Sequence, residues 1–264
     1  MICNQFVFIA LGELLLYLAS SVSCKCWRNC RSGNATWCYS KYGKPDGQWG
    51  GLCKWGKCQS PIVLSKCRST EFYFGPLLFY NYDTPLGYLL VSNNGHGVSI
   101  DIPEILKISI SGGPLASEYA LVNIHWHWDR TEHIIAGQSL ILEMHLVHRN
   151  MKYCNMAQAM KFSDGIAVLA VLHRHSAKSS FYLKKFLPKN FNSYFTYEGS
   201  LTTPPCAESV TWIVFTNFLE ASRKDIEKFK NARLADGSVL ERNFRSVQPI
   251  NNRPIWFNKP CLRY

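Results

Sequence analysis

Short apolar runs, each bounded by glycine, proline or asparagine, recur through most of the chain and constrain its fold more than any other feature. Runs of this length between turn residues are typical of β-strands. They occupy residues 88–91, 105–110, 121–128, 140–147, 166–172 and 210–215. Only residues 223–233 have a persuasive helical spacing of apolar residues. We therefore predict a mostly β protein with minor helices.

Composition limits the classes of function. The chain has 264 residues, of which 47% are hydrophobic and 18% charged, which excludes disorder and coiled coil. A chain this long buries a core without help from a metal, so a metal site in it would serve chemistry. The formal charge of +11 suits an anionic partner. Because the basic residues are scattered and form no run interleaved with aromatics, we expect no nucleic-acid binding.

The N-terminus indicates export. An apolar run over residues 6–19 ends in the small residues Ser21-Val22-Ser23, which predicts a signal peptide at residues 1–23. An uncleaved membrane anchor is the alternative, and Glu13 inside the run disfavours it. We expect no stable membrane span, and a secreted, extracellular product. The sequence leaves the oligomeric state open.

Cysteines gather just after this segment. Ten of the eleven cysteines follow residue 23, an even number that suits disulfides in an oxidising compartment. Zinc knuckles are the competing interpretation of Cys24, Cys26 and Cys30. We divide the chain into a signal peptide (1–23), a Cys-rich N-terminal extension (24–36) that carries a glycosylation sequon at Asn34, and one domain (37–264).

Residues 121–128 carry the most informative pattern. Successive side chains of a strand point to opposite faces, so Asn123, His125 and His127 should share one face. The opposite face should hold Val122, Ile124, Trp126 and Trp128.

A second alternating run puts Glu143, His145 and Val147 on one face. If the two strands pair, three histidines converge. Three imidazoles with a fourth position open is the ligand set of a catalytic zinc site. Asn123 and Glu143 lie two residues from a ligand on the same face, where they can accept hydrogen bonds from ring N–H groups.

A rival pair, His173 and His175, has the same spacing. Arg174 and Lys178 lie beside it, and no acidic or third histidine partner accompanies it. We predict a surface strand end there.

An ordered series of motifs extends well beyond the histidines. Its members are Gln59-Ser60-Pro61-Ile62, Asn93-Asn94-Gly95-His96, Gly112-Gly113-Pro114-Leu115, His125-Trp126-His127-Trp128, Glu132-His133, Glu143-Met144-His145-Leu146-Val147-His148, Gly199-Ser200-Leu201-Thr202-Thr203-Pro204-Pro205 and Gln248-Pro249-Ile250-Asn251-Asn252-Arg253. From about residue 37 to 257 the chain resembles the α-class carbonic anhydrases of the secreted type. The resemblance implies a single domain built on a large, twisted, mostly antiparallel sheet with a central conical cleft. It also implies a zinc-dependent lyase that reversibly hydrates carbon dioxide to bicarbonate and a proton.

The resemblance also assigns roles. His125, His127 and His145 match the zinc ligands, and Asn123 stands where the family has a longer glutamine. Thr202 matches the residue that accepts a hydrogen bond from the zinc-bound hydroxide, donates one to Glu132 and binds a substrate oxygen through its backbone N–H.

Further positions match the substrate site and the proton path. Val147, Val168, Leu201 and Trp212 match the apolar wall beside the metal, and Thr202 and Thr203 border the substrate. His96 matches the proton shuttle, a role that suits an imidazole at neutral pH. Tyr39, Asn94, Ser99 and Thr203 match the family positions that order the water chain leading to this shuttle.

Secreted members of this family commonly carry a disulfide that braces the threonine turn. Cys206 fits one half of it, and either Cys53 or Cys58 fits the other; we favour Cys53. A binding protein for anionic extracellular matrix or mineral, built on the same scaffold, is the alternative function.

Overall fold

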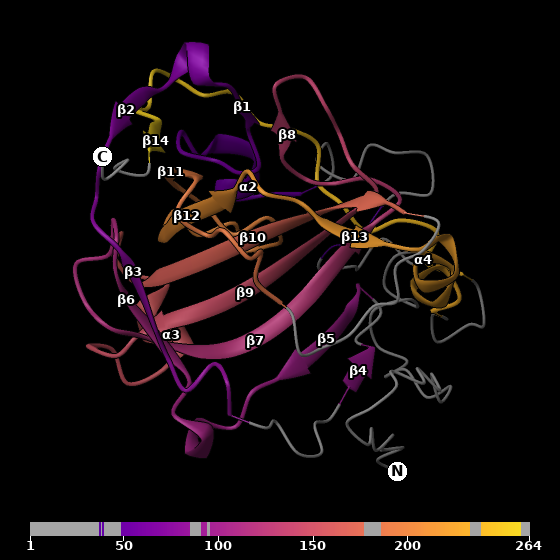
Figure 1. Ribbon diagram of the computed structural model, residues 1–264, viewed down its shortest axis with the longest axis horizontal. Helices are drawn as coiled ribbons and strands as arrows, with labels where there is room; N and C mark the ends of the chain where they lie inside the picture. The colour runs from indigo at the N-terminus through magenta and orange to yellow at the C-terminus, as the bar shows by residue number, and fades with distance from the viewer. Residues whose placement is uncertain are drawn as a thin grey trace.

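The computed structural model describes residues 37, 39, 49–84, 91–93, 96–176, 186–232 and 239–259. The predicted signal peptide (1–23), the predicted Cys-rich extension (24–36, with the sequon at Asn34) and Asn94 lie outside these residues. Within them, one large curled sheet crosses the molecule, with short helices at its margins (Figure 1). No helix in the described part is long and apolar enough to cross a membrane.

The described residues form short helices and strands. In chain order these are α2 (Leu52–Trp55), β1 (Val63–Leu64), η2 (Lys66–Arg68), β2 (Thr70–Phe72), β3 (Leu77–Tyr80), β4 (Val91–Asn93), β5 (Val98–Asp101), η3 (Glu104–Leu106), β6 (Ser109–Gly112), β7 (Tyr119–Trp128), β8 (Ile134–Ile135), β9 (Leu142–Asn150), α3 (Met156–Ala159), β10 (Ile166–His175), β11 (Tyr194–Gly199), β12 (Val210–Phe215), β13 (Leu219–Ala221), α4 (Arg223–Lys230) and β14 (Trp256–Asn258). The prediction of a mostly β protein with minor helices is confirmed.

The main sheet follows the order β2-β14-β11-β12-β10-β9-β7-β5-β4. Strands β3, β6 and β13 attach to it at the side. Eight of its eleven described strand pairings are antiparallel, which confirms that prediction. The parallel pairings join β10 to β12 and β13, and β14 to β2.

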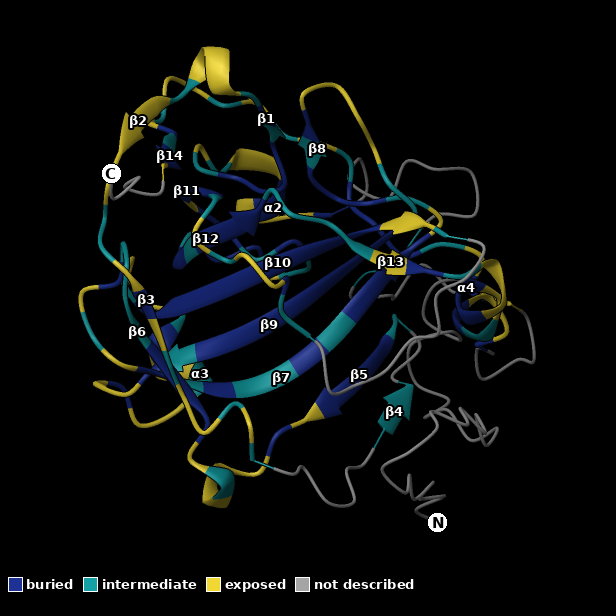
Figure 2. Ribbon diagram, viewed as in Figure 1, coloured by how far each residue is buried: buried dark blue, intermediate teal, exposed yellow. Residues whose placement is uncertain are grey.

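The centre of the sheet is buried on both faces, as the dark β9 and β10 show (Figure 2). Along β10, Val168 and Ala170 pack in one apolar cluster, and Leu169 and Val171 pack in the other. A strand covered on both faces is apolar at every position, which explains the unbroken apolar run from residue 166 to 172. This buried centre holds the functional side chains described below.

Two predicted boundaries differ from the structure. Residues 105–110 do not form one strand: η3 comes first, Lys107 adopts a left-handed φ of 48°, and β6 begins at Ser109. The side chain of Ile105 is 83% exposed, so its apolar character did not indicate a buried strand. The predicted helix begins at Arg223, where Ser222 and Asp225 form a capping box, and it ends at Lys230.

Candidate metal centre

The pairing of β7 with β9 brings three histidines together. These strands are antiparallel neighbours in the sheet (Figure 1). Their register places His125 directly opposite His145. His127 follows on the same face of β7. One ring nitrogen of each histidine lies within 4.8 Å of those of the other two. The three candidate ligands therefore converge as the alternation of the two strands predicts.

A β-bulge changes the alternation at the start of this motif. The register between β7 and β9 shifts between Leu121 and Asn123, so Val122 is an extra residue. Val122 packs against the apolar cluster that contains Val147, whereas Ile124 packs in the opposite cluster. The prediction that Val122 shares a face with Ile124 is therefore wrong.

Hydrogen bonds fix the orientation of the His127 and His145 rings. His127 Nδ1 lies 2.6 Å from the Asn243 carbonyl oxygen, and His145 Nε2 lies 2.8 Å from Glu143 Oε1. A carbonyl oxygen only accepts and Glu143 is ionised, so both of these ring nitrogens carry the proton. His127 Nε2 and His145 Nδ1 then present lone pairs toward each other across 3.1 Å. Two facing lone pairs repel, and a cation between them removes the repulsion.

Asn123 orients the third ring. Its Oδ1 lies 2.8 Å from His125 Nδ1, so the shorter amide reaches the ring and Nε2 is left for a metal. All three inner nitrogens are therefore acceptors, the form of histidine that binds metal. Neutral nitrogen ligands with no cysteine or carboxylate among them suit Zn²⁺.

The pKa values favour neutral rings in this cluster. Burial, together with the neighbouring imidazoles, lowers the pKa of His145 to about 4 and that of His125 well below its usual value. At neutral pH the rings of His125 and His145 are therefore uncharged, and each has one nitrogen available as a ligand.

Glu143 joins His145 to a further buried network. Its carboxylate accepts from His145 and from His133 Nδ1, the latter at 2.6 Å, and His133 Nε2 lies 2.8 Å from the Tyr197 hydroxyl. Burial by itself raises the pKa of Glu143, but His133 and His145 hold it well below its usual value. Glu143, His133 and His145 could also be counted as a metal-binding trio. Their mutual hydrogen bonds instead make this group the outer support of the first cluster.

Glu132 lies beside the cluster. Its Oε1 accepts the Arg245 backbone N–H at 2.7 Å, and its Oε2 lies 3.5 Å from His127 Nε2. Burial raises the pKa of this carboxyl, while His127, the Arg245 backbone and the Thr202 hydroxyl act in the opposite direction. Oε2 accepts no hydrogen bond from the described residues, and the Thr202 hydroxyl lies near enough to this carboxyl to lower its pKa.

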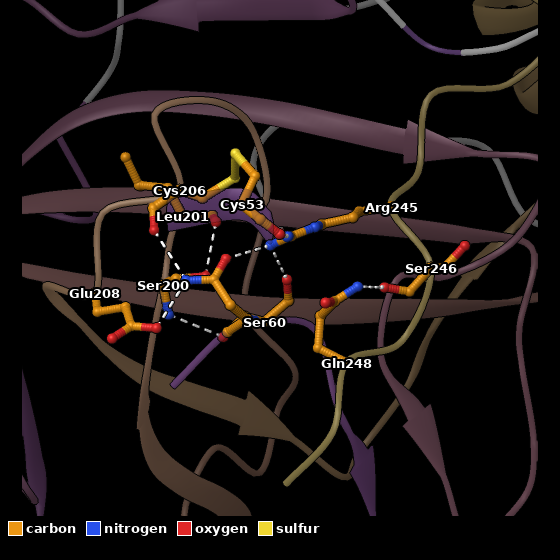
Figure 3. Close-up of a disulfide and its surroundings, with 10 residues drawn as sticks. Cys53, Ser60, Ser200, Leu201, Cys206, Glu208, Arg245, Ser246 and Gln248 are labelled. Atoms are coloured by element: carbon orange, nitrogen blue, oxygen red, sulfur yellow. Dashed lines mark hydrogen bonds between the residues drawn. A yellow bond between two sulfur atoms is a disulfide. The ribbon is translucent and has the colours of Figure 1, made fainter. Parts of the chain in front are cut away.

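The turn that carries Thr202 is braced from several sides (Figure 3). A disulfide joins Cys206 to Cys53 across 153 residues, the pairing that we favoured, and Cys58 keeps a free thiol. The Ser200 backbone N–H donates to Ser60 Oγ at 3.0 Å, and the Ser60 N–H donates to Ser200 Oγ at 2.9 Å.

Arg245 links this brace to Glu132. Its guanidinium is fully buried and donates to Gln59 Oε1, the Ser60 carbonyl and the Cys53 carbonyl at 2.8 to 2.9 Å. Sequence reasoning missed both Arg245 and Asn243. They lie in an irregular segment far along the chain from their partners, where no periodicity signals them.

A cavity of about 180 Å³ opens at the histidine cluster. Its lining comprises Trp37, Tyr39, His96, Gly97, Ser99, Asn123, His125, Trp126, His127, Thr203 and Asn243. Four positions assigned to the substrate site or proton path, namely Tyr39, His96, Ser99 and Thr203, thus share one cavity with His125. The His96 ring stacks on Trp37 with centroids 3.7 Å apart, and burial lowers its pKa to about 4.

The four wall residues lie together on the histidine side of the sheet. Val147, Val168 and Trp212 are buried in one apolar cluster, and Leu201 packs against it half-buried. The Trp212 ring lies 4.9 Å from that of His145. The structure therefore places apolar surface next to a candidate ligand.

The rival histidine pair lies at the end of β10. His173 is buried, His175 is exposed, and Arg174 forms an ion pair with Glu220 at 2.9 Å. Neither histidine belongs to a potential metal-binding group among the described residues.

A curled, mostly antiparallel sheet brings three imidazoles together, and two of them, His125 and His127, line the cavity. Three histidines with room for a further ligand form a group that could hold a metal ion in the manner of a catalytic site. Sequence comparison identifies the family: a family model described as eukaryotic-type carbonic anhydrase matches residues 44–180 and 173–259. The chain belongs to the carbonic anhydrase family, whose general reaction is carbon dioxide hydration and whose members are generally zinc-dependent.

Curated relatives agree with this assignment. The chain is 30% identical over 246 residues to carbonic anhydrase 6 of Homo sapiens, a match that covers 79% of this chain and 78% of the relative. It is 34% identical over 254 residues to carbonic anhydrase 7 of Mus musculus, with 81% of this chain and 95% of the relative covered. A third relative, carbonic anhydrase 12 of Homo sapiens, is 31% identical over 257 residues.

Proposed function

We propose that this protein is a secreted, zinc-dependent carbonic anhydrase that reversibly hydrates carbon dioxide to bicarbonate. The observation that carries the proposal is the convergence of three imidazole nitrogens, each kept unprotonated by an acceptor on the far side of its ring. His125, His127 and His145 would hold the metal. Bound zinc would act as a Lewis acid that makes hydroxide available at neutral pH.

Thr202 and Glu132 would orient the attacking oxygen. An ionised Glu132 accepts only, so the Thr202 hydroxyl must donate to it and can then accept from the nucleophile. This arrangement directs a lone pair of the nucleophile toward the substrate carbon. The raised pKa of Glu132 opposes ionisation, and a cation beside His127 would favour it.

The remaining cavity residues would bind substrate and remove the proton. Carbon dioxide is apolar, which suits the wall of Val147, Val168, Leu201 and Trp212. His96 is the proposed proton acceptor. With a pKa of about 4 it releases a proton readily but accepts one poorly at neutral pH. Proton transfer should therefore limit turnover and respond strongly to added buffer.

Secretion is supported by two features. One is the signal-like segment at residues 1–23, and the other is the Cys53–Cys206 disulfide, which persists in oxidising compartments. Binding to anionic matrix gains no specific support, because Lys228 and Lys230 of the basic α4 form ion pairs with acidic residues.

Stopped-flow carbon dioxide hydration, with zinc analysis of the same samples, tests the proposal. We expect hydration at about one zinc per chain, both lost in His145→Ala and both retained in His175→Ala, which removes an exposed histidine outside the site. Equal hydration rates in wild type and His145→Ala would contradict the proposal.

A further inference from the structure

Asn123 makes a second set of contacts on the side away from His125. Its Nδ2 donates to Asp101 Oδ1 at 2.8 Å and lies 3.4 Å from the Ile100 carbonyl oxygen. Asp101 is the residue of β5 directly opposite Asn123 of β7. A continuous chain of hydrogen bonds therefore runs from Asp101 through Asn123 to His125.

His125 is the candidate ligand whose outer partner, the Asn123 amide, can either accept or donate a hydrogen bond. The partners of His127 and His145 are a backbone carbonyl and an ionised carboxylate, which can only accept. An amide can rotate by half a turn and present its NH₂ group instead. In that orientation His125 Nδ1 would have to accept, and the proton would move to Nε2, the nitrogen that faces the metal site.

A neighbouring carboxylate removes this ambiguity. Because an ionised Asp101 has no proton to donate, it attracts the NH₂ end of Asn123 and repels the oxygen end. The oxygen then faces His125 Nδ1, as the structure shows. The Ile100 carbonyl favours the same orientation.

From this chain of contacts we infer that Asp101 is a positioning residue that selects the metal-binding tautomer of His125 by fixing the Asn123 amide. The inference rests on the proposed zinc site and deepens it. Asp101 is exposed, so its effect is that of a single solvent-accessible hydrogen bond. Its removal should weaken zinc binding about 2-fold to 10-fold, the range of one net hydrogen bond.

Imidazole ¹⁵N NMR of the metal-free protein tests the inference without any catalytic readout, and chelator competition gives the zinc Kd of the same samples. In wild type we expect His125 as the Nδ1–H tautomer. Asp101→Ala should populate the Nε2–H tautomer and raise the zinc Kd. Asp101→Asn keeps the shape of the side chain but can present either its oxygen or its NH₂ group to Asn123, so it should restore at most part of both properties.

Two controls separate positioning from general strand stability. Glu220→Ala removes an exposed acid from another cross-strand pair, Arg174 with Glu220, and should change neither readout. In an Asn123→Ala background, Asp101→Ala should have no further effect on zinc affinity. An unchanged His125 tautomer in Asp101→Ala would overturn the inference. So would a loss of zinc affinity on Asp101→Ala that is as large in the Asn123→Ala background as in wild type. Failure of wild type to bind zinc would instead refute the proposed function, while the tautomer measurement would still test Asp101.

Discussion

Protonation of the buried His148 should destabilise the protein in acid. This histidine lies in β9 on the face away from the metal centre, is fully buried, and has its Nε2 2.5 Å from the Tyr82 hydroxyl. Burial lowers its pKa from 6.5 to about 3, and backbone hydrogen bonds at Ala167 and Leu146 offset part of this effect. Between about pH 3 and pH 6.5, His148 is therefore protonated in the unfolded chain but remains neutral in the folded chain.

The sign and size of this effect on the free energy of unfolding follow from the difference in pKa between the folded and unfolded states. The contribution of His148 is fully present above its unfolded pKa of 6.5 and is lost as pH falls from 6.5 toward about 3. Each pH unit in that window costs about 1.4 kcal/mol. At pH 5 the loss should be about 2 kcal/mol relative to pH 8.

Urea denaturation of wild type and His148→Gln at several pH values isolates the contribution of His148 to the free energy of unfolding. Both proteins keep the metal centre, so acid loss of zinc cancels in their difference. We expect the stability of wild type relative to His148→Gln to fall by about 2 kcal/mol between pH 8 and pH 5. Tyr82→Phe, which keeps the burial, should retain the pH dependence. A wild-type minus His148→Gln difference that stays constant with pH would refute the reasoning.

Three further changes probe the framework around the site. Asn243→Ala removes three side-chain hydrogen bonds, two of them to the backbone of β7, and should lower the free energy of unfolding by about 2 to 4 kcal/mol in urea; a loss below about 1 kcal/mol would contradict its bridging role. Cys206→Ser opens a long covalent loop and should cost about 3 to 5 kcal/mol under non-reducing conditions, so an unchanged midpoint would show that the disulfide does not stabilise the fold. Trp37→Ala exposes His96 and should raise its pKa from about 4 toward 6.5 in an NMR titration, whereas an unchanged pKa would show that Trp37 does not cause the burial.

The centre of the site could be predicted because it depends on local periodicity. His125, His127 and His145 alternate with apolar residues on two strands, and the register of β7 with β9 follows from which faces are buried. The bulge at Val122 could not be predicted from the sequence. It arises from the register between β7 and β9, in which Leu121 and Asn123 pair with consecutive residues of the partner strand.

The outer support of the site required the tertiary structure. Asn243 reaches His127 from a segment without regular structure, and Arg245 contacts residues nearly two hundred positions away. The choice of Cys53 over Cys58 came from family resemblance alone. Asp101 also gave no signal, because a carboxylate at a strand end is ordinarily a solvated residue.

Zinc K-edge X-ray absorption on the purified protein tests the central claim most directly. The account predicts three nitrogen ligands at about 2.0 to 2.1 Å and one further light atom, with the nitrogen count reduced or the zinc lost in His145→Ala. Sulfur scattering at about 2.3 Å would place the metal on cysteines instead and would contradict the account.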